Sequence, residues 1–310
     1  QILIGILLGE GSYSVKNTYD TIPGLTTLAQ LGVLYTCIYY YEFRQGKEWE
    51  YRYKIYFYII AILILVRTVV WSERLALVEL VVPIGIIFIS TYRPQKILIR
   101  KLMPYLPYIG VIGIVIFFGV FEYFRSWQTY GHLYDSYWSF TVDRLGLYYF
   151  TAINNGAAVL VETEWPSYSF RAYFNWFYEL PVIGTHIKDL IPQESYGDWR
   201  SFLNTYLDPE FNNPSGIFFV FHNSGIIGAS LFAILMGIFS GITFLQFLNN
   251  KGLGKYIFPF FFIYFIDMIR VPYITSTRSF PIFLFAILGF YYFSKKIEIK
   301  KYILRRKNES

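Results

Sequence analysis

The stretch that decides the fold is Gly216–Phe247, which reads GIFFVFHNSGIIGASLFAILMGIFSGITFLQF. A straight helix of this length would extend about 48 Å, whereas the hydrocarbon core of a bilayer is about 30 Å thick. The polar sequence His222-Asn-Ser-Gly225 divides the stretch. We therefore expect a short interfacial piece, followed by a transmembrane helix that begins near Ser224, a favourable N-cap residue.

Small residues recur at every fourth position of this expected helix: Gly225, Ala229, Ala233, Gly237 and Gly241. A ridge of small side chains lets a neighbouring helix approach closely. We expect another helix to pack on it.

Apolar character extends through the whole chain, of which 55% is hydrophobic and 22% aromatic. Runs of roughly 18–20 apolar residues predict further spans, so we expect an all-α polytopic membrane protein with a bundle of about eight transmembrane helices. Because Gln1 already lies in an apolar run, we expect earlier spans to be missing. The remaining expected spans cover residues 24–41, 55–70, 75–90, 102–121, 256–268 and 280–293.

Basic residues cluster around Arg93, Lys251 and Lys295. The positive-inside rule places these segments in the cytoplasm, which explains the net charge of +6 without a nucleic-acid partner. The spans then alternate, and the turns 71–74 and 270–279 and the long loop fall outside. The expected parts are an N-terminal transmembrane bundle (1–121), an extracytoplasmic loop (122–215), C-terminal helices (216–294) and a basic tail (295–310).

The long outer loop is rich in tryptophan and arginine, and we expect it to contain short amphipathic helices. Aromatic faces stack on sugar rings, and guanidinium groups bind phosphates with two parallel hydrogen bonds. The loop therefore indicates a site for a large, anionic, sugar-like molecule. Its tryptophans are Trp127, Trp138, Trp165, Trp176 and Trp199, and its arginines are Arg125, Arg144, Arg171 and Arg200.

The outer positive charges are nearly all arginine, whereas the tail mixes lysine and arginine. Topology would be served by either residue, but a diphosphate favours the planar, bidentate guanidinium group. We expect a lipid-linked diphosphate as substrate. Arg67, with Glu73 or Glu79 nearby, would be costly in the membrane unless paired or lining a wet cavity. The other outer candidates are Arg74, Arg270 and Arg278.

His222 is the histidine placed at a break in an apolar segment. Beside the positive end of a helix its neutral form is favoured, which suits a general base. Motifs for zinc proteases, nucleotide-binding loops and serine hydrolases are absent from the sequence. Cys37 is the single cysteine, so neither a disulfide framework nor a cysteine metal site is expected. We expect no metal and no cofactor.

Three runs resemble bacterial O-antigen and capsular repeat-unit polymerases of the Wzy type. They are Trp71–Pro83 (WSERLALVELVVP), Asp143–Gly156 (DRLGLYYFTAINNG) and Asn213–Gly228 (NPSGIFFVFHNSGIIG). The resemblance implies a GT-C-like glycosyltransferase in the bacterial cytoplasmic membrane that joins undecaprenyl-diphosphate-linked oligosaccharides at the outer face. It also implies no metal or nucleotide sugar. Implied partners are membrane lipids, a chain-length regulator and a repeat-unit flippase.

Arg144, Arg74 and His222 lie in the matching runs and take the implied catalytic roles. We expect Arg144 and Arg74 to stabilise the departing diphosphate, and His222, Glu162 or Glu164 to accept the proton of the attacking hydroxyl. The expected substrate-binding residues are Arg125, Arg270, Arg278, Asn154, Asn155 and Glu73.

Three other interpretations stay open. An O-antigen ligase would use the same donor, and a polyprenyl-phosphate-sugar glycosyltransferase would use an early outer acid such as Glu10 or Asp20. A transporter or flippase of lipid-linked sugars would need internal repeats and a central polar pathway, neither of which the sequence shows.

Overall fold

The computed structural model describes residues 22, 25–70, 74–92, 101–187 and 198–292. Within these ranges the regular structure is helical and contains no β-strand, which confirms the all-α prediction. The longer helices are α3 (Gln30–Arg44), α4 (Tyr51–Val70), α5 (Arg74–Thr91), α7 (Leu106–Glu122), α9 (Tyr137–Glu162), α14 (Gly216–Leu248), α15 (Gly254–Asp267) and a final helix, Phe280–Tyr292.

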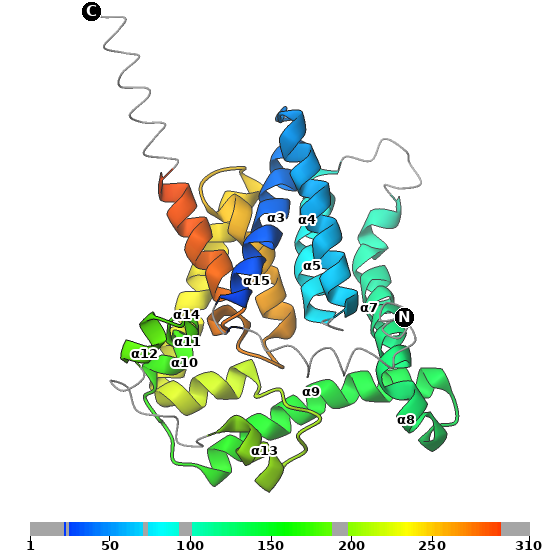
Figure 1. The fold of residues 1–310 in the computed structure, drawn as a ribbon, viewed down its shortest axis with the longest axis vertical. Coiled ribbons are helices and arrows are strands. Elements are labelled where there is room, and N and C mark those ends of the chain that lie inside the picture. The colour runs from blue at the N-terminus through cyan, green and yellow to red at the C-terminus, as the bar shows by residue number, and fades with distance from the viewer. Residues whose placement is uncertain (1–21, 23–24, 71–73, 93–100, 188–197, 293–310) are drawn as a thin grey trace, which may run out of the picture.

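These helices alternate in direction, as the apolar runs predict. In Figure 1, α3, α5, α14 and the final helix run one way, whereas α4, α7 and α15 run the other. Among the described residues, α14 is the one helix that is both long and apolar enough to cross a membrane. Only 17% of its most apolar window is buried, so most of its apolar surface faces outward. The expected bundle of about eight spans stays a prediction.

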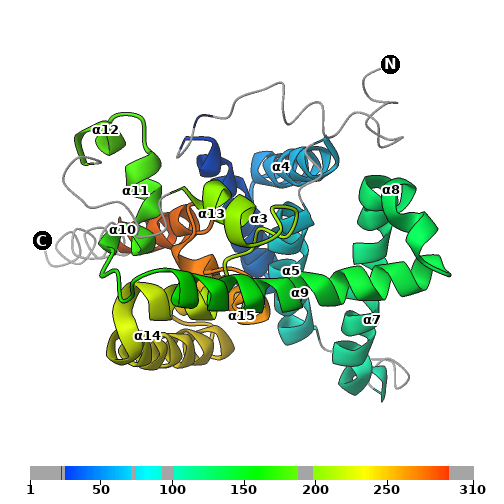
Figure 2. The same cartoon turned by 90° about the horizontal axis from the view of Figure 1, so that it is seen from below.

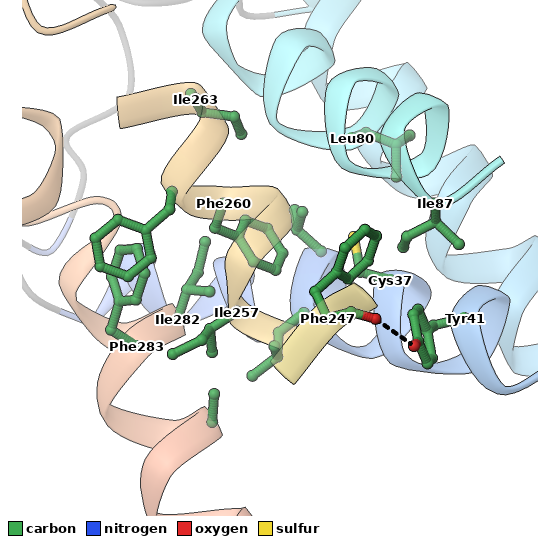
Figure 3. Packing of buried hydrophobic residues seen from close by; sticks show 14 of the residues in the cluster. Cys37, Tyr41, Leu80, Ile87, Phe247, Ile257, Phe260, Ile263, Ile282 and Phe283 are labelled. Carbon is green, nitrogen blue, oxygen red and sulfur yellow. Dashed lines mark hydrogen bonds between the residues drawn. The ribbon is translucent and has the colours of Figure 1, made fainter. Parts of the chain in front are cut away.

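The core lies where α3, α5, α14, α15 and the final helix meet (Figure 3). Aromatic and aliphatic side chains from all five interdigitate there, including Phe260 and Ile282, which are both fully buried. Tyr41 is 1% exposed, and its hydroxyl donates a hydrogen bond to the carbonyl oxygen of Phe247 at 3.4 Å. This bond joins the last turn of α3 to the last turn of α14.

The predicted break in α14 is present at Gly225, where φ is +66° and ψ is −178°. Only glycine adopts this conformation without steric cost. The piece before Gly225 lies across the end of the bundle beside α9, and the piece after it runs along the bundle (Figure 1). A Cβ atom at Gly156 of α9 would lie 2.5 Å from the Cβ of Phe218, so this contact requires a glycine.

The later part of the small-residue ridge of α14, from Ala233 to Gly241, does not receive the helix that we expected, whereas Gly225 and Ala229 are buried. Within the described chain, no atom lies within 4 Å of a Cβ built at Gly237 or Gly241, and Ala233 is exposed. Helix α15 packs on another face, where the close approach depends on its own Gly254. A Cβ there would lie 2.5 Å from the carbonyl oxygen of Thr243.

The long loop differs from the expected set of short amphipathic helices because it contains α9, a helix of 26 residues. Ser136 caps it by accepting a hydrogen bond from the backbone N–H of Ser139 at 3.1 Å. One face, from Phe140 to Val159, is buried. Figures 1 and 2 show α9 crossing the end of the bundle and reaching α7. The shorter helices are α8 (Gln128–Tyr130), α10 (Phe170–Tyr173), α11 (Asn175–Glu179), α12 (Ile183–Ile187) and α13 (Trp199–Tyr206).

Candidate functional site

The segments predicted to share one face of the membrane lie at one end of the bundle. This end holds the last turn of α4, the first turn of α5, the end of α15 and all of α9 (Figure 1). It therefore brings the outer arginines to the same end, although in different surroundings.

A buried carboxylate, Glu79 of α5, organises the first group. It is fully buried, and the Nε of Arg278 donates to its two oxygens at 2.9 and 2.7 Å. The amide of Gln30 donates to it at 2.8 Å, and the hydroxyl of Tyr273 at 3.2 Å. A buried charge is tolerated only when it is paired and hydrogen-bonded. Glu79 thus fixes the guanidinium group of Arg278 in one orientation.

Arg278 lines a cavity of about 330 Å³ together with Arg67 of α4. Most of the other walls are apolar and come from α3, α4 and α5, among them Val33, Leu63 and Ala76. Of the two guanidinium groups, that of Arg278 is paired with the carboxylate of Glu79. A cavity with cationic and apolar walls fits an amphiphilic anion, because the guanidinium groups can bind phosphate while the apolar walls contact a hydrocarbon chain.

Arg144 of α9 forms the second group and is 4% exposed. Its Nη2 donates to a carboxylate oxygen of Glu210, and its Nε lies 3.5 Å from a carboxylate oxygen of Glu122 at the end of α7. Its guanidinium carbon lies 4.8 Å from the ring centroid of Phe211 and 5.0 Å from that of Tyr130. Arg144 therefore holds α9 against α7 and against the segment before α14.

Glu210 also raises the pKa values of Arg144 and Tyr130. Burial alone would lower the pKa of Arg144, but the hydrogen bond and charge of Glu210 and the charge of Glu122 raise it. The hydroxyl of Tyr130 donates to the other oxygen of Glu210 at 2.9 Å. This hydrogen bond, with the charge of Glu210, raises the pKa of Tyr130. The guanidinium group stays charged at neutral pH.

The two candidate asparagines of α9 lie in different environments. Asn155 is 3% exposed, and its side-chain amide donates to the carbonyl oxygens of Phe211 at 2.5 Å and of Asn213 at 3.1 Å. Asn154 is exposed. The amide of Asn155 is thus used to hold the chain that enters α14.

Arg270 connects α15 to α9. One Nη lies 3.1 Å from a carboxylate oxygen of Asp267, and the guanidinium carbon lies 5.7 Å from the ring centroid of Tyr148. The backbone carbonyl of Arg270 accepts a hydrogen bond from the N–H of Ser215 at 2.9 Å. The last outer turn is therefore tied to both α9 and the start of α14.

His222 lies just before the break in α14 and is 1% exposed. Its Nε2 lies 3.2 Å from the hydroxyl oxygen of Thr163, at the end of α9. Its carbonyl oxygen accepts a hydrogen bond from the N–H of Ser167 at 2.9 Å. The neighbouring Asn223 accepts a hydrogen bond from the hydroxyl of Ser167, also at 2.9 Å. The imidazole is thus packed under the segment that follows α9.

The positions of three other predicted site residues are not described in full. Glu73 lies outside the described residues, and the side chains of Arg74 and Arg125 lie outside the described part of their helices. Three residues of these groups were not among the predicted site residues. Gln30 and Tyr273 contact Glu79, and Glu210 contacts Arg144, in each case from a distant part of the chain. Gln30 was visible as a polar residue within an apolar run.

Comparisons of this chain with protein-family models, with curated proteins and with solved structures find no match.

Proposed function

We propose that this protein is a membrane-embedded glycosyltransferase that joins oligosaccharide repeat units carried on undecaprenyl diphosphate. The products would be O-antigen, capsular or exopolysaccharide chains, made at the outer face of the bacterial cytoplasmic membrane. Chain-length regulator and flippase partners belong to the same proposal.

The apolar exterior supports a membrane location. Large aliphatic side chains point outward from α4, α7 and α14: Leu63 is 60% exposed, Ile112 60% and Ile227 79%. Soluble proteins seldom expose contiguous apolar patches of this extent. A bilayer would cover these faces and leave the end with α9 in the interfacial layer.

The single observation that carries the proposal is the cavity shared by Arg67 and Arg278. Two guanidinium groups beside apolar walls match the two halves of a lipid diphosphate, since the phosphates need bidentate donors and the prenyl chain needs apolar contact. Glu79 neutralises one of these positive charges.

In the proposed reaction, a sugar hydroxyl of one repeat unit attacks the anomeric carbon of the growing chain. The carbon–oxygen bond to the diphosphate breaks, and undecaprenyl diphosphate leaves with the bonding electron pair. Arg278 and Arg67 stabilise the developing negative charge. The hydroxyl proton passes to His222 or to a carboxylate at the end of α9, Glu162 or Glu164. Arg144 contributes by positioning α9.

The test uses purified protein in lipid nanodiscs with a synthetic undecaprenyl-diphosphate oligosaccharide and separates the products by gel electrophoresis. The wild-type protein should give a ladder of products that differ by one repeat unit. Arg67→Gln should reduce the rate about 100-fold, because it removes a preorganised donor to the leaving group. The same loss is expected for Arg278→Gln combined with Glu79→Gln, which avoids an unpaired buried carboxylate.

The matched control is Arg52→Gln, an exposed arginine in the first turn of α4, paired with Glu50 at 2.7 Å. It should leave the ladder unchanged, and thermal unfolding should verify that every variant is folded. Full activity in both cavity variants would refute the proposal. Transfer of one repeat unit to a separate acceptor, without a ladder, would favour the ligase instead.

A further inference from the structure

A second cavity lies at the break in α14, and Tyr173 of α10 forms part of its wall. Its volume is about 450 Å³, which is within the range of about 300–1,000 Å³ typical of small-molecule sites.

The polar side chains that line this groove are uncharged. Hydroxyl groups come from Tyr168, Ser169, Tyr173 and Ser224, and an amide comes from Asn223. Among the described residues that line it, none has a charged side chain. This composition differs from that of the cavity with Arg67 and Arg278, and it disfavours an anion, which needs cationic or preorganised donors.

One hydroxyl of the groove is left for a ligand. Ser169 is 7% exposed, and its hydroxyl oxygen has no hydrogen-bond partner within the described chain. Buried polar atoms are nearly always hydrogen-bonded, and a ligand hydroxyl in the groove would supply the bond that the described residues leave unmade. The hydroxyls of Tyr173 and Ser224 are hydrogen-bonded to each other beside it, whereas the amide of Asn223 is already engaged by Ser167 and by the carbonyl oxygen of Phe219.

The remaining walls are apolar and continue onto the outer face of α14. Ile227 and Leu231 line the groove and are 79% and 57% exposed. A ligand that fills the groove would therefore place hydroxyl groups near Ser169 and a hydrocarbon chain along α14. The exposed ring of Tyr168 offers an aromatic face at the mouth, of the kind that stacks on sugars.

We propose that this groove binds the uncharged sugar of a membrane-anchored glycan. This inference rests on the proposed function and deepens it: the guanidinium cavity would hold the diphosphate of one lipid-linked chain, and the groove would hold the sugar that is presented by the second. The two substrates are then distinguished by the charge of the walls that bind them.

The test uses a photoreactive probe, octyl β-D-glucoside with a diazirine in its alkyl chain, and the full protein in phosphatidylcholine nanodiscs. Labelling should map to residues 167–173 and 224–231. Unlabelled octyl glucoside should compete for it at least tenfold better than octyl phosphate. Ser169→Ala should weaken glucoside binding about threefold to tenfold, the range expected for one neutral hydrogen bond.

The matched control is Ser230→Ala. Ser230 lies on the same helix, is exposed, and bonds to the carbonyl oxygen of Ile226, so its removal should not change the binding. Leu231→Trp should abolish labelling by filling the groove, and because Leu231 is exposed the variant should still fold. Labelling elsewhere, equal competition by octyl phosphate, or equal effects of the two alanine variants would overturn the inference.

The two proposals fail separately. Labelling of the groove in a protein that makes no polymer ladder would keep the sugar site and refute the polymerase. A ladder without labelling of the groove would refute the sugar site and keep the polymerase.

Discussion

Arg144 shows how a single buried guanidinium determines the position of a long helix. It is matched by the carboxylates of Glu122 and Glu210, of which Glu122 is fully buried. Removal of one partner from a buried ion pair leaves an uncompensated charge, and this costs more than the pair contributes.

Arg144→Met should therefore lower the free energy of unfolding by about 3–5 kcal/mol. The combined change of Arg144→Met with Glu122→Gln should cost less than the single change, because one of the stranded carboxylates is gone. Unfolding titrations in mixed micelles measure both. Arg200→Ala, at an exposed arginine in α13, is the control and should change stability by less than about 0.5 kcal/mol. A similar small effect of Arg144→Met would contradict the structure.

The adjacent residues Asn154 and Asn155 allow a second comparison, between an exposed and a buried asparagine of α9. Asn155→Leu leaves two backbone carbonyls without their donor and should cost about 1–3 kcal/mol. Asn154→Leu affects an exposed side chain and should stay within about 0.5 kcal/mol. The same unfolding titrations measure both variants. Equal effects at the two positions would show that α9 buries a different face from the one that contains Asn155.

The break in α14 divides the helix into two pieces with different roles. The piece before Gly225 carries His222 across the end of the bundle, and the piece after it exposes an apolar face. The ring of Pro166 lies 3.2 Å from where a Cβ of Gly225 would be. Both the positive φ and this contact require a glycine.

Gly225→Ala should destabilise the protein by about 1–3 kcal/mol, the cost of holding an L-residue in a region of positive φ and extended ψ that is essentially restricted to glycine. It should also reduce photolabelling of the groove. Gly237→Ala is the matched control: it has ordinary helical geometry and open space around its Cβ position, so alanine should be neutral or stabilise by up to about 1 kcal/mol. Thermal unfolding in nanodiscs compares the two. Tolerance of alanine at Gly225 would mean that the two pieces form one continuous helix.

At the scale of the whole molecule, polar ends flank a bundle whose outer faces are apolar. The end with α9 holds the buried Arg144, and the opposite end holds the turn between α14 and α15. If the bundle spans a membrane, the two ends must face different compartments.

Cysteines introduced at Asp135, near the start of α9, and at Asn249, in the turn after α14, should react with a membrane-impermeant maleimide from opposite sides. Both positions are exposed. We expect the Asp135 position to be labelled in intact spheroplasts, and the Asn249 position only after permeabilisation. Native Cys37 is 1% exposed and should stay unlabelled. Labelling of both positions from the same side would refute the proposed topology.

The sequence by itself determined the helical class, the approximate bounds of the helices and the break near Gly225. These are local properties, because the length of an apolar run and the position of a glycine are read within one segment. The membrane location and the polymerase activity stay predictions.

Only the tertiary structure decided how the charges pair and where the cavities lie. Arg144 meets Glu210 across 66 residues, and Arg278 meets Glu79 across 199. It also decided that α9 is one long helix and that the later part of the small-residue ridge of α14, from Ala233 to Gly241, lies open within the described chain. Such contacts depend on which helix faces pack together, and the hydrophobic pattern of a single helix does not specify its neighbour.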